Sequence, residues 1–287
     1  MPTKFNLSAW DSIPVTIGDG IDLNEERLMA FPAFQNWQKR LRANLEEQKR
    51  TGHTFEKEPW RLTAIKVHSV HPFDNGKFGF MTIEAFLEKK KNRLERVIFL
   101  RGGSVAVLMI LRPKDAPGER YVILTEQPRI GACSTGFLEI PAGMLDDESG
   151  NVTGKAMKEI KEETGLIVQG KELIDMTALA LENAESKEDL QPAMYPSPAN
   201  LDEYIPILLW EKTMDRKQIE GLKGKLTGER VKDDELITLR VSDYNVLWKE
   251  GARDAKTIAA WALYEGLNRE GRLEEKMKEI RLGRSKR

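Results

Sequence analysis

Three glutamates on one short stretch constrain this chain more than any other feature of its sequence. Glu159, Glu162 and Glu163 lie in the run 143–166, which closes on Gly165. At about 100° per residue, a helix brings Glu159 and Glu163 within about 40° of each other, with Glu162 beside them. Carboxylates gathered on one face of a helix are suited to hold a hard divalent cation.

The ends and the opposite face of this helix are also predicted. Thr153 is the expected N-cap, and Gly165 is expected to end the helix in the left-handed conformation. Met157, Ile160 and Thr164 fall on the side away from the glutamates, so that side is expected to pack against the protein core. Packing would then hold the helix, and with it the carboxylates, in a fixed position.

A glutamate-rich helix face is most often a solvated surface, but the flanking residues oppose that interpretation. The short apolar run 138–143 precedes the helix, and an acidic loop connects the two. This strand, loop and helix resemble the Nudix box of the Nudix hydrolases, Gly-x5-Glu-x7-Arg-Glu-U-x-Glu-Glu-x-Gly-U with U aliphatic. Residues 158–166 match the helix end of that pattern.

The run departs from the box in three places and keeps the glutamates of the helix. Lys158 stands in place of the arginine, and the loop is one residue longer. Ser149 takes the position of the first glutamate, with Glu148 beside it. The lysine affects the ion pair that steadies the helix in the family, because an ammonium group cannot make the planar bidentate contact of an arginine.

The composition is that of a globular enzyme without nucleic-acid or membrane partners. The chain of 287 residues has 45 basic and 46 acidic side chains. A net charge of −1 gives it no general attraction to nucleic acid or to an anionic membrane. One cysteine, Cys133, excludes an internal disulfide and a multi-cysteine zinc site. No apolar run approaches the ~18 residues of a membrane span, and the N-terminus lacks a signal-like segment. We therefore expect a cytoplasmic protein.

Apolar periodicity predicts an N-terminal region before a larger α/β domain. A helix is expected at 24–48, interrupted by Pro32, and a final helix is expected to begin at the N-cap Asp254. The inner face of the final helix is predicted to carry Ala255, Ile258, Ala259, Ala262 and Leu263. Strands are predicted at 62–70, 78–83, 97–100, 105–111, 121–125, 176–181, 204–210 and 236–241.

These elements predict a fold of the α/β class, an α/β/α sandwich around a mixed sheet. A β-rich N-terminal region of residues 1–95 is expected before a catalytic domain of residues 96–287.

The resemblance extends over about residues 60–268. The landmarks are 125–129, 138–143, 196–203, 247–248 and 254–256. They look like those of the ADP-sugar diphosphatase branch, which includes the ADP-ribose pyrophosphatases, and the similarity is greatest to its plant and fungal ADP-sugar members. The resemblance implies a homodimer formed through the N-terminal β-domain. It also implies hydrolysis of the diphosphate of ADP-ribose or ADP-glucose to AMP and a sugar phosphate.

The resemblance also assigns the metal-binding residues. Glu159 and Glu163, with the backbone carbonyl of Ala142, are the expected ligands of Mg²⁺ or Mn²⁺, which prefer oxygen donors. Glu162 is expected as a secondary ligand or a water-orienting group.

Three further residues are candidates for handling the substrate and the water. Glu203, on a loop after the box, matches the glutamate that positions or deprotonates water in the ADP-ribose pyrophosphatases; the alternative is an exposed loop acid. Arg129 is the candidate for gripping a phosphate, and the alternative is a structural ion pair. Glu139 is expected to support the site or to bind substrate.

Other functions find less support in the residues. The segment 150–156 is too short for a phosphate-binding loop and lacks its Ser/Thr. The histidines His53, His68 and His71 all precede the expected catalytic domain, which disfavours a Ser-His-Asp mechanism. Two alternatives stay open: hydrolysis of UDP-sugars or other nucleoside diphosphate derivatives, and a non-catalytic Nudix-like nucleotide-binding protein, which loss of the glutamates would indicate.

Overall fold

The computed structural model describes residues 4–10, 12–145, 151–184, 188–224, 226–227 and 237–282. The chain divides into two compact units. The first comprises Met1–Gly103 with Glu185–Gln191 and Tyr195–Tyr204, and the second comprises Ser104–Ala184, Pro192–Met194 and Ile205–Arg287. The expected division at residue 95 falls inside the last strand of the first unit, β5 (Asn92–Leu100).

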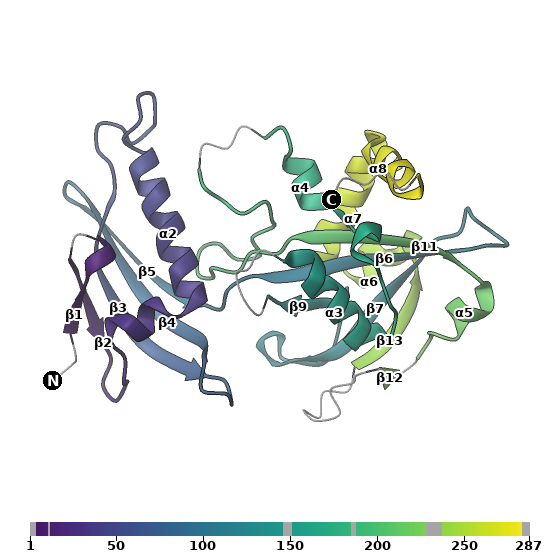
Figure 1. Cartoon of the computed structure of the whole chain (residues 1–287), viewed down its shortest axis with the longest axis horizontal. Coiled ribbons are helices and arrows are strands. Elements are labelled where there is room, and N and C mark those ends of the chain that lie inside the picture. Colours follow the sequence, from purple (N-terminus) through teal and green to yellow (C-terminus); the bar gives the residue numbers. More distant parts are fainter. Residues whose placement is uncertain are drawn as a thin grey trace. The chain divides into compact units, whose positions relative to one another are not determined.

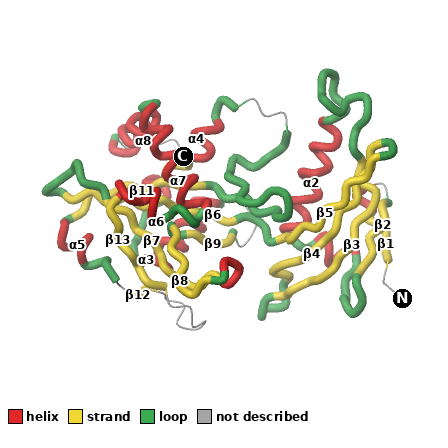
Figure 2. The backbone as a smooth tube through the Cα atoms, turned by 180° about the vertical axis from the view of Figure 1, so that it is seen from behind, coloured by secondary structure: helices red, strands yellow, loops and turns green. Residues whose placement is uncertain are grey.

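A five-stranded mixed sheet forms the first unit, in the order β1-β2-β3-β4-β5 (Figures 1 and 2). Strands β2 and β3 run parallel, and the other neighbours are antiparallel. The strands before β5 are β1 (Lys4–Leu7), β2 (Ile13–Ile17), β3 (Arg61–Pro72) and β4 (Phe78–Lys89).

Two helices pack on this sheet, α1 (Glu25–Met29) and α2 (Pro32–Glu47). The expected interruption at Pro32 is confirmed, because Pro32 is the first residue of α2, where its missing N–H costs nothing. The buried Leu28 and Phe34 join apolar residues of the sheet in one core.

The second unit contains an eight-stranded mixed sheet in the order β10-β11-β6-β7-β13-β12, with β8 paired to β7 and β9 to β6. Strands β11 and β6 are parallel, and the other pairs are antiparallel. The strands are β6 (Ser104–Pro113), β7 (Tyr121–Arg129), β8 (Ser134–Glu139), β9 (Ala142–Met144), β10 (Ile174–Asp175), β11 (Ile207–Met214), β12 (Leu226–Thr227) and β13 (Ile237–Asp243).

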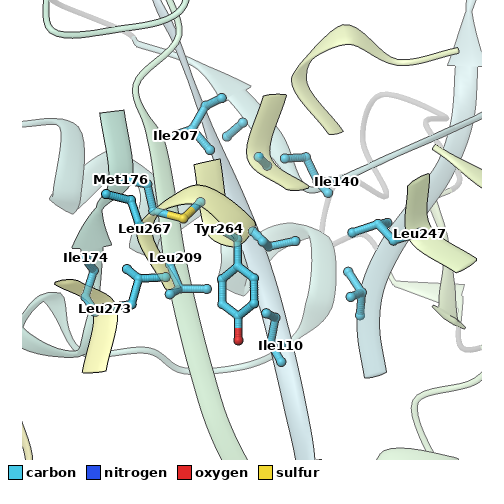
Figure 3. Close-up of a cluster of buried hydrophobic side chains, with 14 of the residues drawn as sticks. Ile110, Ile140, Ile174, Met176, Ile207, Leu209, Leu247, Tyr264, Leu267 and Leu273 are labelled. Atoms are coloured by element: carbon cyan, nitrogen blue, oxygen red, sulfur yellow. The ribbon is translucent and has the colours of Figure 1, made fainter. Parts of the chain in front are cut away.

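Helices cover both faces of this second sheet. Alternating residues of the buried strand β6 supply two separate cores. One core, shown in Figure 3, packs against α4 (Met176–Leu181), α6 (Leu247–Glu250), α7 (Ala255–Arg269) and α8 (Arg272–Arg281). The other packs against α3 (Val152–Thr164) and α5 (Arg216–Glu220). The predicted mixed α/β fold is confirmed.

The strand predicted at 176–181 is wrong, because these residues form α4. The carboxylate of Asp175 caps this helix and accepts hydrogen bonds from the Ala178 N–H at 2.9 Å and the Thr177 hydroxyl at 2.7 Å. A short apolar run does not distinguish a strand from a buried helix turn, and the cap decides it here.

The final helix begins as predicted, and the predicted Ala259 and Leu263 pack partly buried against the core, but its fully buried residues are others. Asp254 caps α7 by accepting the Thr257 N–H at 3.1 Å. The buried residues are Thr257, Ala260, Tyr264 and Leu267, and the predicted Ala255 and Ala262 are exposed. Apolar residues lie all around this helix, so periodicity could not select the face on which Tyr264 and Leu267 enter the core (Figure 3). No helix among the described residues is long and apolar enough to cross a membrane.

Candidate active site

The glutamate helix α3 has both ends fixed by local interactions. Its N-cap is Asn151, whose side chain accepts the Gly154 N–H at 2.8 Å, and not the predicted Thr153, which is exposed. Gly165 ends the helix at φ 71°, as predicted. The helix is therefore placed by a cap that lies two residues earlier than the sequence indicated.

Two of the three box glutamates are buried together with the packing face of the helix. Ile160 and Thr164 are fully buried, as expected for that face. Glu159 and Glu163 are only 3% and 6% exposed. Burying two carboxylates costs free energy unless positive charge or hydrogen bonds compensate them.

Gly143 leaves the space that the Glu159 carboxyl group occupies. A Cβ atom at Gly143 would lie 2.0 Å from Glu159 Cδ and 2.3 Å from Glu159 Oε2. Any side chain on this residue of β9 would therefore displace the glutamate. The sequence motif showed the glycine, but only the structure shows that it makes room for a carboxylate.

Glu163 shares its environment with several predicted site residues. Burial, together with the negative charges of Glu159 and Glu139, raises its pKa to about 8. The charge of Arg129 and a hydrogen bond with the backbone of Ala142 act in the opposite direction. The structure thus brings these five predicted residues into one neighbourhood of the second unit.

Glu139 joins two basic side chains on the strand before the box. Arg129 Nε and Nη2 each lie 2.6 Å from Glu139 Oε1. Lys256 pairs with the other oxygen of Glu139 and, at 2.9 Å, with Asp254 Oδ1. The ion pair expected as an alternative role for Arg129 is present. Arg129 nevertheless keeps 40% of its side chain exposed, so its guanidinium is oriented and still accessible.

The first residues of α7 hold the ion pairs of Glu139 in place. The sequence alone did not assign these residues to the site. Thr257 Oγ1 accepts the backbone N–H of Ile140 at 3.0 Å and donates to Asp254 Oδ2 at 2.5 Å. Lys256 and the cap of α7 therefore hold the strand on which Glu139 lies. The only signal in the sequence was the run 254–256 at a predicted helix cap.

Glu162 and Lys158 lie on the outer side of α3. Glu162 is partly exposed, and Lys158, which replaces the box arginine, lies 3.8 Å from it. Lys155 Nζ lies 2.8 Å from Glu159 Oε1. Glu148 and Ser149 fall outside the described residues.

Glu203 belongs to the first unit. It is buried rather than exposed, and Arg101 Nη1 lies 3.2 Å from its Oε1. The neighbouring Asp202 accepts the backbone N–H groups of Arg101 and Gly102. Asp202 thus binds the backbone of Arg101, and Glu203 binds its side chain. The role of Glu203 in handling water stays a prediction.

The side chains on the buried face of α3 offer the oxygen donors that a hard divalent ion requires. Glu159 and Glu163 offer carboxylate oxygens, which Mg²⁺ and Mn²⁺ prefer. A cation here would offset the burial and charge repulsion that raise the Glu163 pKa. Among the described residues, no group of three or more His, Cys, Asp or Glu side chains is already arranged to hold a metal.

The glycine of β9 and the glutamate helix are the features that resemble a Nudix box, and comparison with known proteins finds a similar sequence of that name. The chain is 34% identical over 218 residues to "Nudix hydrolase 14, chloroplastic" of Arabidopsis thaliana. The match covers 73% of this chain, and the chain spans 64% of the length of that relative. The chain is thus similar to a Nudix hydrolase over most of its own length. No family model matches the chain.

The relative also bears on metal and location. Nudix hydrolases generally use divalent metals such as Mg²⁺. The name of the relative places that protein in the chloroplast, so the cytoplasmic location of this chain stays a prediction.

Proposed function

We propose that this protein hydrolyses the diphosphate of nucleoside diphosphate sugars, with ADP-ribose and ADP-glucose as the expected substrates and AMP and a sugar phosphate as products. The observation that carries the proposal is the buried pair Glu159 and Glu163, seated against the glycine of a Nudix-like box. The similarity to a Nudix hydrolase supports it.

The metal would be Mg²⁺ or Mn²⁺, held by Glu159, Glu163 and the carbonyl of Ala142. When bound, such an ion screens the anionic diphosphate and makes water a better nucleophile. Glu162, on the partly exposed side of α3, would be a secondary ligand or orient the water.

Arg129 would grip a phosphate of the substrate. Its contacts with Glu139 fix the plane of the guanidinium, and a planar guanidinium binds oxyanions through paired hydrogen bonds. Glu139 would act mainly through Arg129, because it is buried and already engaged by Arg129 and Lys256.

Glu203 would orient or deprotonate the attacking water. Arg101 Nη1 lies 3.2 Å from Glu203 Oε1 and orients this side chain, and a glutamate in reach of water can accept its proton or a hydrogen bond.

The protein would work as a homodimer formed through the N-terminal sheet, as the resemblance implies. Phe80 and Phe99 stack at 5.5 Å, Phe73 meets Phe80 edge to face, and Phe73 and Val97 are exposed. Exposed apolar groups of this kind favour burial against another protein surface.

The test is release of product from ADP-ribose, ADP-glucose, UDP-glucose and NADH with Mg²⁺, followed by chromatography. The proposal expects AMP and a sugar phosphate from the ADP-sugars at the highest rate. Faster cleavage of UDP-glucose or NADH would reassign the substrate. Binding without any cleavage would favour the non-catalytic nucleotide-binding alternative.

A further inference from the structure

Lys155 departs from three local preferences for a helical lysine. It is the fourth residue of α3, where the helix dipole favours acidic over basic side chains. It precedes its partner Glu159 by four residues, which is the less favourable order for a helical ion pair. Lysines are rarely buried, yet the Lys155 side chain is only 10% exposed. Departures of this kind are expected where a residue serves function.

The place of the ammonium group accounts for these departures. Lys155 Nζ lies 2.8 Å from Glu159 Oε1. Glu159 is buried, and its charge acts on Glu163, as does the charge of Glu139. A positive charge at Glu159 offsets part of this repulsion among buried carboxylates.

We propose that Lys155 is a positioning residue, the internal counter-ion of Glu159, which holds this carboxylate in the metal-free protein and competes with the divalent cation for it. The inference rests on the proposed metal site. Competition follows because two positive groups that share one carboxylate repel each other. A lysine suits the task, since its flexible stem lets the compact ammonium withdraw.

The inference is tested by metal binding to the full chain without substrate. Lys155→Met keeps an unbranched apolar side chain and removes the charge, so Mn²⁺ measured by calorimetry should bind about tenfold more tightly, about 1.4 kcal/mol. Lys155→Arg keeps the charge and should return the Kd toward the wild-type value. If Lys155→Met does not fold, Lys155→Gln provides the second uncharged variant.

Thermal unfolding separates this role from a purely structural one. Without metal, Lys155→Met should melt below the wild type, because a buried carboxylate loses its partner. Mn²⁺ should then raise the Tm of the variant by more than it raises that of the wild type. If Lys155 only stabilised the helix, Lys155→Met would lower the Tm by the same amount with and without Mn²⁺. The Kd for Mn²⁺ would then be unchanged.

Lys158 on the same helix provides the matched control. Its ammonium lies 3.8 Å from Glu162, and its side chain is 57% exposed. Exposed pairs contribute little, so Lys158→Met should leave Mn²⁺ binding nearly unchanged. Equal or weaker Mn²⁺ binding by Lys155→Met would overturn the inference while the wild type still binds Mn²⁺. A wild type that binds no Mn²⁺ would overturn the proposed metal site itself, and the inference with it.

Discussion

At the scale of single residues, Glu203 is proposed to act on the attacking water, whereas Glu163 is proposed to bind the metal. If Glu203 handles water, Glu203→Gln should lower kcat by roughly 10²–10⁴-fold, as expected for loss of a general base. The Kd of a non-hydrolysable ADP-ribose analogue, measured by calorimetry with Mg²⁺, should change little. The exposed Glu95 of the same unit gives the control Glu95→Gln. A fully active Glu203→Gln enzyme would transfer the role to Glu162.

Asp202 should make stability depend on pH. Burial raises its pKa to about 6, although the N–H groups of Arg101 and Gly102 oppose this shift. The folded protein therefore keeps a proton that the unfolded chain has released, and this contribution to stability is present below pH ~4 and lost as pH rises through about 6.

The expected loss is about 3 kcal/mol, since the Asp202 pKa rises from 3.8 to about 6 and each pKa unit corresponds to about 1.4 kcal/mol. Denaturant unfolding of the wild type and of Asp202→Asn between pH 4 and pH 7 measures it as a difference between the two profiles. Parallel profiles would show that the Asp202 pKa is not raised.

At the scale of elements, the box helix was predictable and its surroundings were only partly so. Periodicity located the glutamates of α3, and Gly165 located its end. The N-cap was misplaced because Asn151 and Thr153 are both capping residues, and only geometry separates them. The run 176–181 failed for a similar reason, since the cap at Asp175 outweighs an apolar pattern that suits either structure.

The contact between β9 and α3 gives a prediction at this scale. Gly143→Ala places a methyl group where the Glu159 carboxyl lies, so the glutamate must move. We expect at least ~10²-fold lower activity, because a misplaced catalytic group costs about that factor, and weaker Mn²⁺ binding by calorimetry. Gly118→Ala is the matched control, since nothing lies within 4 Å of a Cβ there. Equal activity of the two variants would contradict the seating of Glu159 on Gly143.

At the scale of the whole molecule, two segments from the middle of the chain join the N-terminal unit. Asp189 binds Arg40 at 2.6 Å, and its N–H bonds to Asn44, both on α2. Asn200 bonds to Val97 and Phe99 on β5. Local patterns cannot reveal such returns, because the partners are separated by about a hundred residues or more.

These contacts sharpen the prediction for truncation and assembly. Removing residues 1–95 deletes β1 to β4 and α2, so Asp189 loses Arg40 and Asn44, and β5 loses the strand it pairs with. The remnant should therefore aggregate or lose activity. The intact chain should be a dimer at micromolar concentration, measured by light scattering after size exclusion. A monomeric and fully active fragment would contradict both expectations.

The most direct test of the central claim, metal-dependent hydrolysis at the box, is the turnover of ADP-ribose by Glu163→Gln at saturating Mg²⁺. Loss of a proposed ligand should lower kcat at least ~10³-fold, about 4 kcal/mol of barrier, with the far-UV circular dichroism unchanged. The exposed Glu250 supplies the control Glu250→Gln, which should match the wild type. EDTA should silence the wild type, and added Mg²⁺ should restore it. Near-normal turnover by Glu163→Gln would contradict the claim.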